Sequence, residues 1–156
     1  MAGKHTGASE APSALGVNYI PGSRIDRAFA EGRAAGIVGE ITGTDDTSIA
    51  AATMTNSIAS PVFPTAGVGL DGRVITNVTI STATTNINST ITANTGTVVT
   101  GILSGSGNWD STNAYHITGA VVTDNPHVAG TDESTAWIAG LHSAYAANKQ
   151  YETDRA

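Results

Sequence analysis

Four histidines, one pair of adjacent aspartates and many hydroxyl side chains are the groups that could do chemistry in this 156-residue chain. The histidines show no spacing typical of metal ligands: they are His5, His116, His127 and His142. Asp45 and Asp46 stand side by side at an expected turn, where we expect solvent around them, and no calcium-loop pattern follows. The sequence therefore predicts no metal and no cofactor.

The serines and threonines lack the surroundings of a nucleophile. No Gly-x-Ser-x-Gly elbow occurs, and the chain has no cysteine. The Gly-Ser run at Ser104–Gly107 lacks the Lys-Ser/Thr end of a phosphate loop and is expected to be a flexible turn. Asn77 and Asn88 begin glycosylation sequons, which so Thr-rich a segment produces by chance. We therefore expect a protein that is not an enzyme.

Charge is scarce and unevenly distributed. The net charge is −6 with only seven Lys and Arg, which argues against nucleic acid as a partner. Between Thr47 and Ser111 the only charged residues are Asp71, Arg73 and Asp110. No apolar run approaches the length of a membrane span, and the start lacks the apolar core of a signal peptide, so we expect no membrane association and synthesis in the cytoplasm.

Two helical patterns enclose the uncharged stretch. Ser23 can cap a helix over 24–35 that ends at Gly36, and Thr131 can cap a second one whose first turn holds Asp132 and Glu133. Each carries an interior glycine beside its large apolar residues, which predicts two helices packed closely. The residues expected to pack are Ile25, Phe29, Gly32, Trp137, Gly140 and Leu141.

The stretch between the helices has the patterning of strands. Candidate strands are 73–81, 85–92, 97–103 and 115–123, separated by turn signals such as Asp71-Gly72. Residues 37–41 are a possible strand, and 48–58 fit either a helix or a strand. The fold class expected is α+β, a mainly antiparallel β sandwich or barrel inserted between two short packed helices; a short β-solenoid is a less favoured alternative.

The organisation that follows has three parts. Residues 1–22 form an extended amino-terminal arm, 23–36 and 125–150 the helical pair, and 37–124 the inserted β-rich domain. The arm is either a solvated tail or a segment that docks on a neighbouring subunit. In the second case its contacts would be Leu15, Val17, Tyr19 and Ile20, with Trp109 as an exposed anchor at the interface.

The two ends of the chain resemble the ribosome modulation factor-like family. The stretch 125–140 contains Asn-Pro, a Gly-Thr cap and Ala-Trp-x-x-Gly, and 28–35 reads Ala-x-x-Glu-Gly-x-x-Ala. The resemblance implies a helical hairpin, here split by a β insertion. Family members are basic and keep the helices a few residues apart, whereas this chain is acidic.

The composition resembles that of virion structural proteins of tailed bacteriophages. We therefore expect a capsid decoration or cement protein located in the virion and made in the host cytoplasm. Its expected partner is the major capsid protein or another virion protein, and it is expected to be a homo-oligomer. The alternative is a regulator that binds RNA or ribosomes, which predicts a basic face from Arg24, Arg27 and Arg33.

Overall fold

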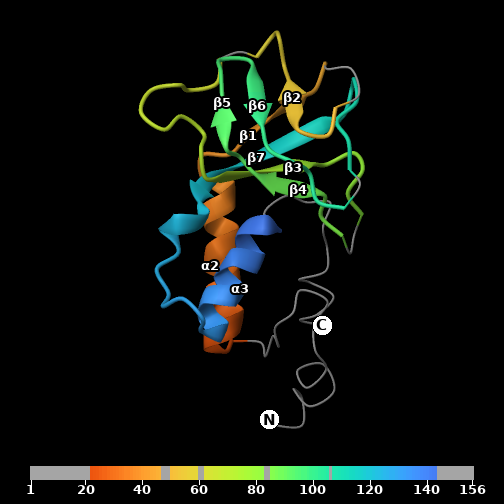
Figure 1. Ribbon diagram of the computed structural model, residues 1–156. Coiled ribbons are helices and arrows are strands. Elements are labelled where there is room, and N and C mark those ends of the chain that lie inside the picture. Colours follow the sequence, from red (N-terminus) through yellow and green to blue (C-terminus); the bar gives the residue numbers. More distant parts are fainter. Residues whose placement is uncertain (1–21, 47–49, 60–61, 83–84, 106, 144–156) are drawn as a thin grey trace.

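The computed structural model describes residues 22–46, 50–59, 62–82, 85–105 and 107–143. It has three layers: a pair of helices, a four-stranded sheet and a three-stranded sheet (Figure 1). Both sheets are antiparallel. The helices lie at the two ends of the described chain with all the strands between them, so the predicted α+β class with a β-rich insertion is confirmed.

Helix α2 spans Arg24–Ile37 and begins as the sequence predicts. The Ser23 hydroxyl accepts a hydrogen bond from the Asp26 backbone N–H at 3.2 Å. The Asp26 carboxylate accepts a second hydrogen bond, from the N–H of Gly22 before the cap, at 2.9 Å. The helix does not end at Gly36 as expected, because Val38 still donates its N–H to the Ala34 carbonyl and acts as the C-cap.

Helix α3 spans Asp132–His142 and is capped by Thr131, whose hydroxyl accepts from the Ser134 N–H at 3.2 Å. Asp132 and Glu133 occupy its first turn, where their charge complements the helix dipole.

The two helices run in the same direction, with both carboxyl ends towards the sheets (Figure 1). Arg24 and Glu133 lie near the two helix starts and form an ion pair of 3.7 Å. After the last strand the chain passes through residues 125–131 back to the far end of α2 before α3 begins (Figure 1). The pair therefore differs from a helical hairpin, in which consecutive helices are antiparallel.

Glycines at the crossing let the two helix backbones approach. A Cβ atom on Gly32 would lie 2.0 Å from the Trp137 carbonyl oxygen, and one on Gly140 would lie 2.1 Å from the Phe29 carbonyl oxygen. Phe29 is fully buried with Ala28 and Ala136, and Ile25 packs on them while remaining partly exposed. Trp137 and Leu141 continue the packing towards Val74 of the sheet.

The four-stranded sheet has the order β1-β7-β3-β4. Its strands are β1 (Ile41–Thr44), β3 (Arg73–Asn77), β4 (Asn88–Thr90) and β7 (Ala114–Val121). Strand β3 is buried on both faces: Val74 meets Trp137 and Leu141, while the next residue, Ile75, belongs to the core between the sheets.

The three-stranded sheet has the order β2-β6-β5, with β2 at Thr53–Thr55, β5 at Ala93–Asn94 and β6 at Val98–Thr100. Both sheets contribute to one core cluster. It comprises Met54, Phe63, Leu70, Ile75, Ile91, Val99, Leu103, Trp109, Tyr115 and Ile117. This shared core holds the two sheets together as a small sandwich.

Several predicted strands are shorter than expected. Residues 37–40 end the helix and turn before β1, and β3 stops at Asn77 because a turn follows. Residues 122–124 form a 3₁₀ turn after β7. The turn at Asp71-Gly72 exists, but it is not a hairpin, since β2 and β3 belong to different sheets.

Trp109 is not the exposed anchor that the sequence suggested. Only 1% of its surface is exposed, and it is among the largest fully buried side chains of the core. Its backbone is fixed by two hydrogen bonds with Ala50, at 2.6 and 3.0 Å. The prediction was wrong because the ring lies in the core that the two sheets share, together with Tyr115 and Ile117.

Candidate functional site

A cleft of about 550 Å³ runs along strand β1. One wall is β1 itself, with Ile41, Thr42 and Thr44. The other is formed by residues on both sides of positions 60–61, among them Ile58 and Val62. These two side chains are 84% and 62% exposed, so the cleft has an apolar rim open to solvent.

Tyr115 and Asn56 form the polar floor of this cleft. The Asn56 amide donates a hydrogen bond to the Tyr115 hydroxyl at 2.9 Å. The tyrosine ring can lie across the neighbouring strand because Gly43, its direct partner in the register, has no side chain: a Cβ there would be 2.4 Å from the hydroxyl oxygen. Phe63 packs edge-on against the same ring. Burial raises the pKa of Tyr115, which keeps the hydroxyl protonated.

Strand β1 is an edge of the four-stranded sheet. The Val78 N–H donates to the Ala114 carbonyl. The peptide groups of the even-numbered residues of β7 therefore point to β3, and those of Tyr115 and Ile117 point to β1. The peptide groups of their partners, Gly43 and Ile41, therefore point to β7. The peptide groups of Thr42 and Thr44 consequently point away from the sheet, where the described part of the chain places no further strand.

The opposite face of this edge carries a buried histidine. His116 lies opposite Thr42 in the register, and its Nε2 is 2.7 Å from the Glu40 carboxylate. Burial of the ring lowers the pKa of His116, and the hydrogen bond and charge of Glu40 act against that shift. Burial also lowers the pKa of His142 in the last turn of α3.

We expect the free energy of unfolding to decrease as the pH falls below 6.5. That is the ordinary pKa of histidine, which the unfolded chain has at both positions, while the folded pKa values are lower. Between the folded and the unfolded pKa, the unfolded state binds more protons than the folded state, so acid favours unfolding. The contribution of these histidines to the free energy of unfolding is therefore fully present above pH 6.5. Urea unfolding at pH 5, 6, 7 and 8 measures this slope.

The variant His116→Gln keeps an amide that can donate to Glu40 but does not titrate. It should flatten the slope between pH 7 and 5, leaving the part due to His142. A variant with the slope of the unchanged protein would contradict the assignment to His116.

The adjacent aspartates do not simply solvate a turn. Asp45 is buried, donates its N–H to the Asn113 carbonyl at 2.7 Å, and accepts the Thr55 N–H on its carboxylate at 3.1 Å. Asp46 remains exposed and accepts the N–H and hydroxyl of Ser57. The prediction that solvent surrounds Asp45 was wrong, because this carboxylate links the edge of the four-stranded sheet to β2.

The remaining candidate groups are dispersed. His127 lies 3.5 Å from Glu31, and the structure does not bring it together with His116 or His142. Within the described residues no group of three or more His, Asp or Glu side chains could hold a metal ion. His5 lies outside these residues.

Asn77, which begins a glycosylation sequon, is fully buried, and its side chain links neighbouring segments by hydrogen bonds. Its amide donates to the Asn108 carbonyl and the Asn113 side chain, and its side-chain oxygen accepts the N–H groups of Thr79 and Ile80.

The structure unites the residues predicted for helix packing and leaves the interface prediction largely open. Ile25, Phe29 and Gly32 of α2 meet α3, as described above. The arm contacts proposed from the sequence, Leu15, Val17, Tyr19 and Ile20, lie outside the described residues.

The cleft was missed at the level of sequence. Its floor and rim come from segments without a periodic pattern, and Phe63 sits between two prolines that indicated only the absence of a central strand. One usable signal was Gly43 in a Thr-rich strand, since an interior glycine often marks close approach of another group.

No protein-family model, curated protein or solved structure matches this chain. Among the described residues, no helix combines the length and the apolar character that crossing a bilayer requires.

Proposed function

We propose that this chain is a structural protein of a tailed-bacteriophage virion, a capsid decoration or cement protein that acts by burying surface against neighbouring proteins. The supporting observation is an apolar, nearly uncharged surface on the sheet layers. Large exposed side chains lie within the stretch that has only three charges: Ile58, Val62, Val68 and Ile102, each at least 62% exposed.

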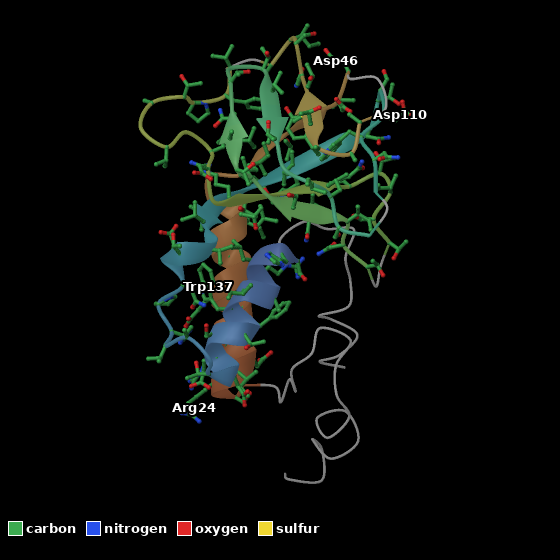
Figure 2. The ribbon with its side chains drawn as sticks, in the orientation of Figure 1. Arg24, Asp46, Asp110 and Trp137 are labelled. Atoms are coloured by element: carbon green, nitrogen blue, oxygen red, sulfur yellow. The ribbon has the colours of Figure 1, made fainter. Side chains whose placement is uncertain are left out.

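Such a surface suits protein contact better than chemistry. The cores of protein–protein interfaces are depleted of charged residues, and exposed apolar groups gain free energy when a partner removes them from water. The two charged residues labelled on the sheet layers, Asp46 and Asp110, lie together towards one side, far from Arg24 at the start of α2 (Figure 2). Asp71 is exposed as well, and a partner that leaves these three carboxylates in water could cover the apolar side chains without burying an unpaired charge.

The geometry does not favour the RNA-binding alternative. Arg24 and Arg33 are nine residues apart on α2, and at about 100° per residue they point to opposite sides of the helix. Arg24 is also directed to Glu133. These arginines do not form the clustered basic face that binding to phosphates requires.

The test is whether the protein is part of a particle. Virions produced from the genome that encodes this chain should contain it in many copies, measured by quantitative mass spectrometry of gradient-purified particles. Particles made without its gene should lose shell stability on heating or at low salt. Purified virions that lack the protein would overturn the proposal.

A further inference from the structure

The open edge of β1 and the cleft beside it form a complete site for an extended peptide. Thr42 and Thr44 direct their peptide groups outwards, as the hydrogen-bond alternation described above requires. Beside them the cleft offers the apolar rim of Ile58 and Val62 and the aromatic ring of Phe63. A strand added at such an edge gains main-chain hydrogen bonds, and alternate side chains enter the neighbouring pockets.

The surface chemistry disfavours an acidic occupant and suits an uncharged segment. Among the described lining residues Glu40 is the charged one, and its carboxylate is hydrogen-bonded to His116 on the other face of the strand. An acidic peptide would find no counter-charge in the cleft and would lose hydration, whereas an uncharged peptide loses none of this kind.

The chain itself contains a segment with these properties. Leu15, Val17 and Tyr19 alternate with Gly16 and Asn18, which is the period of a strand with one apolar face. No charged residue occurs from position 11 to position 23.

The segment of one chain is too close to α2 to fill its own cleft. Helix α2 has 14 residues and is about 20 Å long, and Figure 1 shows its start at the end farthest from the sheets. Tyr19 precedes Arg24 by only five residues, which span at most about 18 Å when fully extended. Because β1 begins beyond the far end of the helix, residues 15–20 cannot lie along it as a strand in the same chain.

We propose that residues 15–20 of one copy add as a strand to the β1 edge of a second copy, with Leu15, Val17 and Tyr19 turned towards the cleft. Each copy then donates one arm and receives one, which gives a closed homo-oligomer when two copies exchange arms or when a ring of copies closes. The inference concerns self-association and holds whether or not the protein belongs to a virion.

Matched substitutions in the arm test the occupant. The variants Val17→Asp and Asn18→Asp add the same charge one residue apart, on opposite faces of the added strand. In light scattering coupled to size exclusion, Val17→Asp should shift the oligomer to monomer, and Asn18→Asp should keep the oligomer. A monomeric unchanged protein at micromolar concentration, or equal effects of the two variants, would overturn the proposal.

Matched substitutions at the edge test the site. Thr42→Pro removes an outward N–H, which edge strands tolerate, and Thr42→Val keeps it. The proline variant should become monomeric with an unchanged circular dichroism spectrum, while the valine variant remains assembled. If Thr42→Pro stays folded and assembled, β1 is not the docking edge.

A cross-link locates the contact directly, because the natural chain has no cysteine. Equal amounts of the single variants Val17→Cys and Ile58→Cys are mixed and oxidised, with Val128→Cys replacing Ile58→Cys in the control. Val128 is comparably exposed but lies before α3, on the helical side. A mixed disulfide should form between Val17→Cys and Ile58→Cys but not between Val17→Cys and Val128→Cys. Equal yields of the two mixed disulfides would refute the assigned site. Virion composition is a separate readout, so failure here leaves the particle test unaffected.

Discussion

Gly32→Ala is expected to destabilise the protein by about 3 kcal/mol, although alanine is the better helix former. In an isolated helix the same change would stabilise by about 1 kcal/mol. Here the added Cβ would fall 2.0 Å from the Trp137 carbonyl oxygen, which belongs to the backbone of α3 and cannot rotate away. The helices must separate, and Phe29 then loses packing. Urea unfolding followed by tryptophan fluorescence measures the change.

The control is the reverse substitution on the exposed side of the same helix. Ala30 is exposed, so Ala30→Gly should cost about 1 kcal/mol from helix propensity alone. Gly140→Ala should resemble Gly32→Ala, since its Cβ would lie 2.1 Å from the Phe29 carbonyl oxygen. The double variant should lose less unfolding free energy than the two single variants lose in sum, because helices that have already separated accommodate the second methyl group. A stabilised Gly32→Ala variant would mean that the helices are not in contact at this position.

The helices were predictable because the signals are local. Ser23 with Asp26 and Thr131 with Asp132 define helix starts within four residues of sequence, and the structure shows both caps. The interior glycines also carried information, since a costly residue inside a helix needs a packing reason. The common direction of the helices was not predictable, because it depends on where the chain leaves the last strand of the β insertion and on the path it then takes to the start of α3.

The strands were found as segments but not as a topology. Strand β3 is buried on both faces, so its burial pattern does not say which face meets the helices. The assignment of strands to two sheets depends on contacts between distant segments, such as the hydrogen bond from Thr55 to the Asp45 carboxylate. The cleft at β1 follows from the same long-range arrangement.

Strand β1 has few of the features that protect an edge strand from pairing. It has only four residues, and short length is itself a protection, but it contains two exposed threonines and has neither a lysine nor a proline. An edge that receives a partner strand needs no further protection, so the sequence of β1 agrees with the proposed exchange of residues 15–20.

Trp109→Ala should cost about 3–5 kcal/mol of unfolding free energy, the largest loss expected of a single core truncation here. The indole is 1% exposed and lies in the core with Tyr115 and Ile117 of β7, so its removal leaves a cavity where the two sheets meet. Calorimetry at several protein concentrations separates this loss from any effect on assembly.

The matched control is Ile102→Ala, which truncates a large apolar side chain that is 75% exposed and should change the stability by less than about 0.5 kcal/mol. The sequence had suggested that Trp109 anchors an interface, and the two placements predict opposite results. An interfacial tryptophan would leave the monomer as stable as before and weaken assembly alone. If Trp109→Ala behaves in that way, the enclosed position of the ring is wrong; a large loss that does not depend on protein concentration agrees with the core.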